Sequence, residues 1–122
     1  MTVNELRIGN LIKQPTLGGT LTVDWMIIEI ISKLGDYYAY EPIPLTEDWL
    51  LKRTEYKLHH EDSAMKIFRI DEHENVFIVF HKESGEFRSW GHPLVGIHEL
   101  QNLFYAMERK ELEITNQQPE HE

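Results

Sequence analysis

The chain has 122 residues, which is enough for one domain with a single hydrophobic core. Its formal net charge is −9, from 21 Asp and Glu against 12 Lys and Arg. A negative charge of this size disfavours binding to nucleic-acid phosphates and favours a basic partner surface, although it also simply keeps a small domain in solution. The absence of cysteine excludes disulfides, thiol nucleophiles and cysteine zinc sites.

No targeting or membrane segment is expected. The first ten residues include Glu5 and Arg7 and lack the basic start and apolar run of a signal peptide. The longest apolar cluster, residues 25–31, is interrupted by Glu29 and is much shorter than the roughly 20 residues that span a bilayer. We therefore expect a soluble, cytoplasmic protein with no membrane partner.

The N-terminal third predicts short strands. Residues 6–13 predict a first strand with a bulge at Gly9, and residues 15–19 predict a loop that reverses the chain at its two glycines. Residues 20–31 alternate between apolar and polar side chains as far as Ile27, which predicts a second strand.

The segment at residues 24–34 permits two interpretations, because the alternation fails after Ile27. We favour a strand with a bulge, since isoleucine is β-branched and suits a pleated surface. The alternative is a short helix capped by Asp24. Its apolar face would consist of Ile27, Ile30, Ile31 and Leu34.

In the middle of the chain, the sequence predicts a hairpin turn, a third strand at which the sheet ends, and a short helix. Residues 33–36 predict a hairpin turn, and residues 37–41 predict a third strand paired with the second. Pro42 and Pro44 cannot donate ladder hydrogen bonds, so the sheet is expected to end there. Thr46 then caps a helix that is expected to end near residue 54.

The second half predicts strands followed by one long helix. Four strands separated by polar turns are expected at residues 56–60, 64–71, 76–82 and 86–90. Residues 93–112 show the clearest helical periodicity in the sequence. The expected buried face consists of Leu100, Leu103, Phe104 and Met107.

These elements predict an α+β fold. We expect one domain over residues 1–114, with a twisted antiparallel sheet that is partly an SH3-like barrel in its N-terminal half. The C-terminal amphipathic helix and the short middle helix are expected to pack on this sheet. Residues 115–122 have nothing to bury and are expected to form a disordered acidic tail.

The histidines do not form a recognisable metal pattern. The densest groups of potential ligands are His59, His60, Glu61 and Asp62, and His92 with His98 and Glu99. Zinc sites usually show histidines at i and i+4 on a helix or fixed cysteine and histidine spacings, and neither is present. We therefore expect no metal and no other cofactor.

No catalytic pattern is evident either. Ser84 and Ser89 lie near His81 and His92 in the sequence, but neither serine follows the strand-turn-helix pattern of a nucleophile. Paired acids such as those at residues 61–62 and 71–72 fall in predicted turns, where solvated side chains are the simplest interpretation. We expect that the protein is not an enzyme.

The aromatic residues indicate both a hydrophobic core and a partner-binding surface. Trp49, Trp90, Phe104 and Tyr105 are expected to be buried for the most part. Tyr105, however, lies on the flank of the C-terminal helix opposite its apolar face, and tyrosine and arginine are favoured at protein interfaces. The expected partner-binding residues are Gln101, Tyr105, Glu108 and Arg109.

Three segments resemble a family of small uncharacterised proteins from prophages and mobile elements of Bacteroides-type bacteria. They are Asn4-Glu5-Leu6-Arg7-Ile8-Gly9-Asn10-Leu11, the residues 42–51 that begin Pro-Ile-Pro-Leu-Thr-Glu, and the residues 98–107 that begin His-Glu-Leu-Gln-Asn. Proteins similar to these tend to have a Thr-Gly turn after the long helix. Here Glu108-Arg109-Lys110 stands in that place.

The resemblance implies a bacterial host and a mobile-element protein without an assigned activity. Small acidic proteins of such elements are often inhibitors of host defence, as anti-CRISPR proteins are. By this analogy the expected function is binding and inhibition of a basic host nucleoprotein or nuclease, with an RNA-targeting type VI effector as a candidate target. No direct nucleic-acid contact is expected.

Two other functions remain open. The first is a small SH3-like nucleic-acid-binding module, which requires a basic patch. The residues that would have to cluster are Arg7, Lys13, Lys52, Arg53, Lys57 and Lys66. The second is a metal-dependent enzyme, which requires His59, His60, His92 or His98 to converge with a carboxylate.

Overall fold

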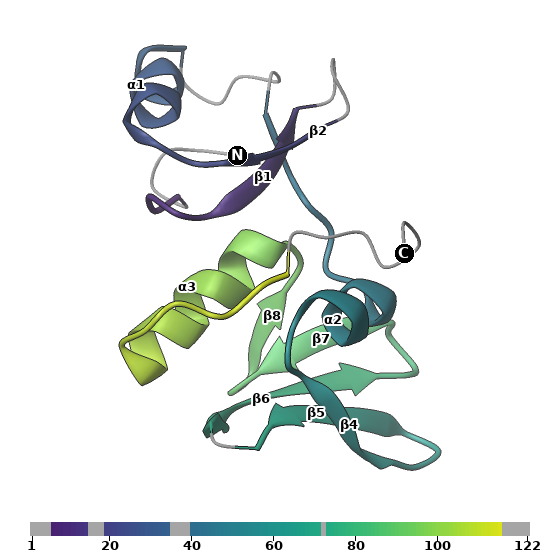
Figure 1. Cartoon of the computed structure of the whole chain (residues 1–122). Helices are drawn as coiled ribbons and strands as arrows, with labels where there is room; N and C mark the ends of the chain where they lie inside the picture. The colour runs from purple at the N-terminus through teal and green to yellow at the C-terminus, as the bar shows by residue number, and fades with distance from the viewer. Residues whose placement is uncertain (1–5, 15–18, 35–39, 72, 116–122) are drawn as a thin grey trace, which may run out of the picture. The chain divides into compact units, whose positions relative to one another are not determined.

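The computed structural model describes residues 6–14, 19–34, 40–71 and 73–115, and it has an α+β fold with two antiparallel sheets (Figure 1). The chain divides into two compact units, each built from two separate segments. The smaller unit takes residues 1–44 and 96–102, and the larger takes residues 45–95 and 103–122. Helix α3 (Ile97–Glu108) therefore contributes its first turns to the smaller unit and its last turns to the larger.

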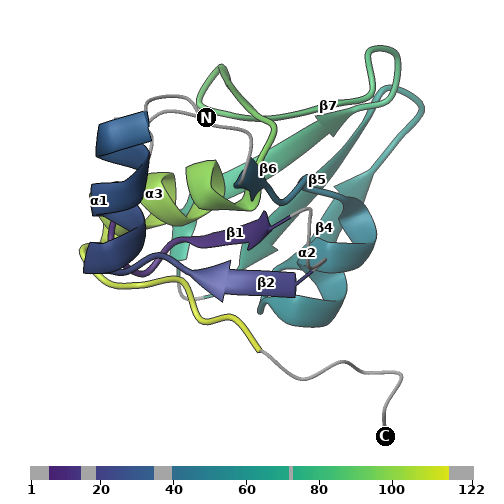
Figure 2. The same cartoon turned by 90° about the horizontal axis from the view of Figure 1, so that it is seen from above.

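The smaller unit contains a three-stranded sheet in the order β2-β1-β3. Its strands are β1 (Leu11–Gln14), β2 (Gly19–Thr22) and β3 (Glu41–Pro42). Figure 2 shows β1 and β2 side by side and antiparallel. Ile12 of β1 lies opposite Leu21 on one side and Pro42 on the other. The predicted third strand is thus partly wrong, because Glu41 pairs with β1; residues 35–39 lie outside the described residues.

Residues 25–34 form a helix, so the favoured strand interpretation of this segment is wrong. Helix α1 (Trp25–Leu34) begins after Asp24, whose Oδ1 accepts a hydrogen bond from the Ile27 amide at 3.0 Å. Ile27 and Ile31 pack with Ile12 of β1 in one core cluster. Burial of this helical face outweighs the β-propensity of the isoleucines.

The larger unit contains a five-stranded sheet in the order β4-β5-β6-β7-β8, with every neighbouring pair antiparallel. The four strands that the sequence predicts in this region are confirmed, and a fifth follows them. They are β4 (Lys57–Glu61), β5 (Met65–Ile70), β6 (His73–His81), β7 (Glu86–Ser89) and β8 (His92–Leu94). Because β8 pairs with β7, residues 93–96 precede α3, and the predicted helical start at Pro93 is wrong.

Helix α2 (Glu47–Arg53) confirms the predicted middle helix. The Thr46 hydroxyl accepts a hydrogen bond from the Trp49 amide at 3.1 Å, which satisfies one of the free amides of the first turn. Leu50 is fully buried. Both α2 and the last turns of α3 lie on one face of the five-stranded sheet (Figure 1).

Phe104 and Tyr56 anchor the core of the larger unit. Phe104 is 1% exposed, and its ring meets the His73 ring edge-on at 5.4 Å, which places the end of α3 against β6. Tyr56 is also buried, and its hydroxyl donates to the Val76 carbonyl oxygen at 2.6 Å. Burial, with a smaller contribution from the charge of Glu108, raises the pKa of Tyr56 well above its ordinary value.

Two further sequence predictions need correction. Met107 is 41% exposed and Leu103 is only partly buried, so the apolar face of α3 is narrower than its periodicity predicts. No closed barrel is present in the part of the chain that the structure describes, which excludes the SH3-like barrel there. The predicted tail lies almost wholly outside the described residues.

Arg109 ends helix α3 in the left-handed conformation that favours glycine. Its φ is +59°, and its amide donates to the Tyr105 carbonyl oxygen at 2.8 Å. We expect Arg109→Gly to leave stability unchanged or to raise the free energy of unfolding by up to about 1 kcal/mol, because the Cβ strain is removed. Urea denaturation measures this difference.

Ala106→Gly is the matched control, because the same residue is introduced at an exposed position inside α3. This change should lower the free energy of unfolding by about 1 kcal/mol. An equal loss of stability in both variants would contradict the proposed helix end.

Candidate interaction surface

A polar groove of about 440 Å³ opens on the larger unit. Its walls come from the start of β4, the β5–β6 connection and the chain after α3. The lining residues are Glu55, Lys57, Ile70, Asp71, His73, Lys110 and Glu113. Ile70 and His73 face each other across the β5–β6 hairpin, and this pairing brings Asp71 to the groove. We call this feature the acidic groove.

A second groove of about 250 Å³ shares Glu55 and Glu113 with the acidic groove. Reciprocal bonds attach the C-terminal segment to the end of α2 here. The Thr115 amide donates to the Arg53 carbonyl oxygen at 2.9 Å, and Arg53 Nε donates to the Thr115 carbonyl oxygen at 3.0 Å. These bonds fix the segment that carries Glu113.

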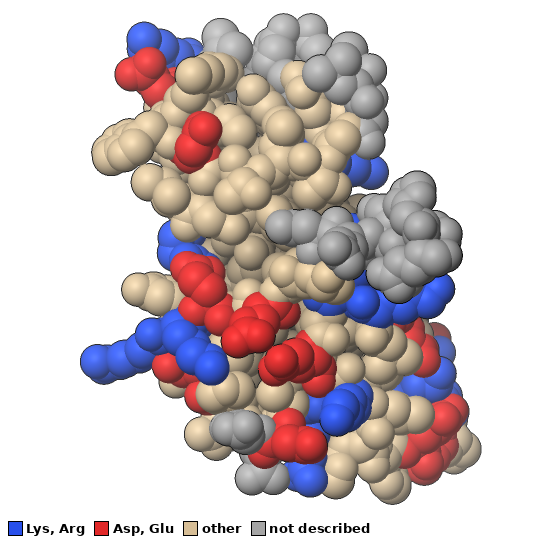
Figure 3. Space-filling view, in the orientation of Figure 1, with Lys and Arg blue, Asp and Glu red and all other residues tan. Residues whose placement is uncertain are grey.

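The carboxylates of the acidic groove remain accessible. Lys57 Nζ and Asp71 Oδ2 are 3.9 Å apart, and both side chains are 75% exposed, so water screens this pair strongly. Glu55 and Glu113 are also exposed. Figure 3 shows acidic side chains gathered in the middle of this face of the larger unit, with basic side chains around them.

His73 links the acidic groove to α3. Its Nδ1 lies 2.7 Å from Glu108 Oε1, and the two side chains are only 19% and 15% exposed. Glu108 therefore holds the end of α3 against β6. Tyr105 and Arg109, the other predicted partner contacts on this end of the helix, are exposed, as the sequence predicts. Their role in binding stays a prediction.

Gln101 does not lie on an exposed flank, so its predicted exposure is wrong. It is 3% exposed, and its Oε1 accepts a hydrogen bond from the Leu11 amide at 2.7 Å. Its Nε2 donates to the Gly9 carbonyl oxygen at 3.2 Å. Gln101 thus satisfies buried backbone groups of the smaller unit, a role that helical periodicity alone does not reveal.

The basic residues required by the SH3-like nucleic-acid alternative are divided between the two units. Arg7 and Lys13 belong to the smaller unit and the other four to the larger. Most of them also have local acidic or polar partners. These pairs are Lys13–Glu41, Lys52–Asp48, Lys57–Asp71, Lys66–Glu47 and Arg7–Asn102, while Arg53 lies over the Trp49 ring.

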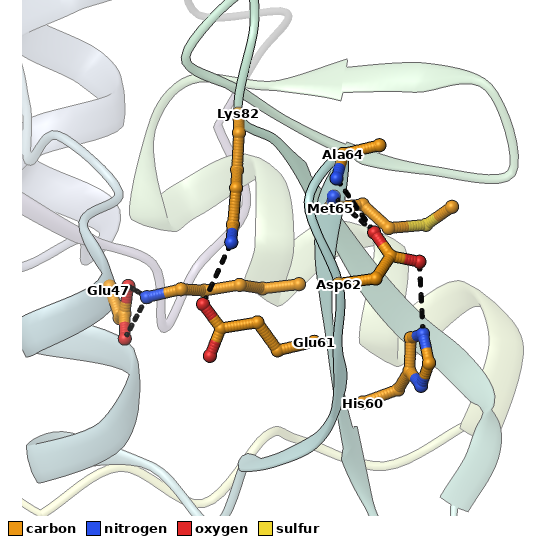
Figure 4. A network of polar contacts seen from close by, with 8 residues as sticks. Glu47, His60, Glu61, Asp62, Ala64, Met65 and Lys82 are labelled. Atoms are coloured by element: carbon orange, nitrogen blue, oxygen red, sulfur yellow. Dashed lines mark hydrogen bonds and ion pairs between the residues drawn. The ribbon is translucent and has the colours of Figure 1, made fainter.

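Three of the potential ligands at residues 59–62, namely His60, Glu61 and Asp62, take part in a network of polar contacts (Figure 4). His60 Nε2 lies 3.1 Å from Asp62 Oδ2, and Asp62 Oδ1 accepts from the amides of Ala64 and Met65 at 2.8 and 2.9 Å. These bonds, the Ala64 amide first, lower the pKa of Asp62. Asp62 thus caps the β4–β5 turn.

Lysine side chains pair with Glu61 of this hairpin and with Glu47 of α2. Lys82 Nζ donates to Glu61 at 2.9 Å and lowers the pKa of that carboxyl group. Lys66 Nζ contacts both oxygens of Glu47, which raises the pKa of the lysine. Within the described ranges, no group of three or more His, Asp or Glu side chains is placed to hold a metal ion.

The serines, histidines and tryptophan that remain from the sequence analysis differ in burial. The hydroxyl of Ser89, which is buried, donates to the Phe77 carbonyl oxygen at 2.6 Å, and Ser84 lies in the exposed β6–β7 turn. His98 is buried and His92 is exposed. Trp90 is 57% exposed, so its predicted burial is wrong.

The chain matches no protein-family model, no curated protein and no solved structure. The resemblance to prophage proteins therefore stays a prediction. No helix among the described residues is long and apolar enough to cross a membrane.

Proposed function

We propose that this protein binds a basic surface of a host nucleoprotein and inhibits it in the manner of anti-CRISPR proteins. The acidic groove is the observation that carries this proposal. Three accessible carboxylates, those of Glu55, Asp71 and Glu113, line it beside two lysines. A lysine or arginine side chain of a partner entering the groove would find several acceptors.

The charge of the whole chain supports the same kind of partner. A net charge of −9 raises the rate of encounter with a cationic surface, such as the channel of a nuclease that carries guide RNA. A purified RNA-targeting type VI effector is accordingly the first target to test.

The end of α3 supplies further contact area beside these acids. Tyr105, Glu108 and Arg109 are spaced i, i+3 and i+4 and share one side of the helix, and Glu108 contacts His73 of the groove wall. Tyr105 is 43% exposed, and tyrosine rings are frequent energetic anchors of interfaces.

Co-elution with the effector tests the proposal. We expect a complex on size-exclusion chromatography at low salt that dissociates at high salt, because screening weakens charge pairing. The double variant Glu55→Gln/Glu113→Gln should weaken the complex by roughly 10-fold or more, which corresponds to about 1.4 kcal/mol or more.

The double variant Glu29→Gln/Glu41→Gln is the matched control for charge, because both glutamates lie in the other unit and their side chains are 69% and 49% exposed. This variant should bind as the unchanged protein does. Equal binding by the groove variant and the control would remove the groove from the interface. Absence of a complex with any basic nuclease would contradict the proposed function.

A further inference from the structure

The five-stranded sheet of the larger unit has one face that its helices do not cover. On the covered face, Lys66 of β5 reaches Glu47 of α2, and His73 of β6 meets Phe104 of α3. Phe68 and Ile78, which pair across β5 and β6, are fully buried. Within the described part of this unit, no helix lies on the opposite face.

The opposite face carries the side chains that alternate with this core. The strand register aligns Ile67, Val79, Arg88 and Pro93 in one row across β5 to β8. Phe77 precedes Val79 by two residues, so it lies on the same face. Ile67, Phe77 and Val79 are partly exposed, which leaves an apolar strip in the middle of this face. We call this surface the open face.

Trp90 lies at the edge of the open face in a strained turn. Trp90 and Gly91 connect β7 to β8, with φ values of +52° and +81°. Asparagine or glycine would adopt the positive φ of Trp90 with less backbone strain than tryptophan does. The indole N–H donates to the Asn75 carbonyl oxygen at 2.7 Å, and the ring lies 5.5 Å from the Phe77 ring. The turn thus presents a fixed aromatic ring that is 57% exposed.

The charges near the apolar strip are mainly positive, in contrast to the chain as a whole. The rows of the open face carry Lys57, Arg69 and Arg88 against Glu86, and Asp71 lies 3.9 Å from Lys57. Arg88 also lines a groove of about 790 Å³ at one end of this face. Two residues of that groove, Lys82 and Arg88, are cationic, and one, Glu83, is acidic. Its residues are Ser63, Ala64, His81, Lys82, Glu83, Ser84 and Arg88.

We propose that the open face binds single-stranded nucleic acid, with bases stacked on Trp90 and Phe77 and phosphates near Arg88 and the groove that it lines. Sheet faces with exposed aromatic and basic side chains suit unpaired strands, because every base offers a ring face for stacking. The Arg88 guanidinium is held by Glu86 Oε1 at 3.1 Å and by the Gly91 carbonyl oxygen at 3.0 Å, which fixes it beside the Trp90 turn.

The net charge of −9 limits the affinity but does not prevent this contact. The Debye length is about 8 Å at physiological salt, so acids on the helix-covered side are largely screened from a strand on the open face. Binding should weaken as salt increases. This proposal does not rest on inhibition of a host nucleoprotein, although a guide RNA would be one source of such a strand.

Fluorescence anisotropy with labelled oligo-U RNA and oligo-dT of about 12 nucleotides tests the proposal, since this length covers a typical single-strand site. We expect saturable binding at low salt and weaker binding at about 200 mM salt. Trp90→Gly should weaken binding by roughly 5- to 150-fold, because stacking is lost while glycine accepts the positive φ. Comparison of the two oligomers shows whether the strand must be RNA.

The matched controls are residues that do not belong to the open face. Trp25→Ala removes a tryptophan that is 77% exposed on α1, and Lys52→Gln removes a cation of α2. Both should bind as the unchanged protein does. Arg88→Gln should weaken binding independently of Trp90, and circular dichroism establishes that each variant is folded.

Three outcomes would overturn the proposal. The first is the absence of binding at about 100 μM protein, which is the typical range of weak non-specific association. The second is equal binding by Trp90→Gly, Arg88→Gln and the two control variants. The third is a dimer in sedimentation analysis that Trp90→Gly dissociates, which would assign the open face to a second copy of the chain.

Discussion

Replacing Phe104 with alanine is expected to lower the free energy of unfolding by about 3–5 kcal/mol. Phe104 is 1% exposed and contacts His73 edge-on, so truncation leaves a cavity between α3 and β6 in the core of the larger unit. Urea denaturation followed by circular dichroism measures the loss. The change is large compared with the 5–15 kcal/mol that stabilises a typical domain.

Tyr105→Ala is the control for this prediction, because Tyr105 is the next residue of α3 and is 43% exposed. It should change the free energy of unfolding by less than about 0.5 kcal/mol. A loss below about 1 kcal/mol for Phe104→Ala would mean that the ring is not packed in this core.

Ile31→Ala is expected to cost about 2–5 kcal/mol, and it tests the conformation of residues 25–34. Ile31 is 2% exposed and packs with Ile12, Val23 and Ile27 in the smaller unit. The helix buries this side chain on the sheet of three strands. Thermal or urea denaturation of the full chain measures the loss.

The comparison variant is Trp25→Ala, because the two interpretations of this segment differ at Trp25. A strand continuing the alternation would bury Trp25 beside Val23 and Ile27, whereas α1 leaves it 77% exposed. We expect Trp25→Ala to cost less than about 0.5 kcal/mol. A larger cost for Trp25→Ala than for Ile31→Ala would contradict the helix.

Local signals were sufficient for much of the larger unit. Polar turns delimit four of its strands and the Thr46 cap marks the start of α2, because these features depend on neighbouring residues. Periodicity also located α3 and the burial of Leu100 and Phe104. The fold class followed from these elements.

The conformations of residues 24–34 and of β8 cannot be predicted from their own sequence, because they depend on tertiary contacts. Isoleucine favours strands locally. In the smaller unit, however, the helical conformation is stabilised because it buries Ile27 and Ile31 in the core. Strand β8 has three residues and includes Pro93, and only its pairing with β7 identifies it as a strand.

The candidate surface was less predictable than the fold, because its residues are distant in sequence. Glu55, Asp71 and Glu113 meet at the acidic groove only after the β5–β6 hairpin and the return of the chain past α2 are in place. Tyr105 and Arg109 could be found from the spacing of α3 alone. The roles of Gln101 and Glu108 depend on partners far along the chain, at Leu11 and His73.

Zero-length carbodiimide cross-linking of the complex with a purified basic effector tests the central claim most directly, because it joins a carboxylate only to an amine in contact with it. We expect peptides that link Glu55, Asp71 or Glu113 to lysines of the effector, and the yield should fall at high salt. Cross-links confined to acids outside the acidic groove, or no cross-link at all, would contradict the account.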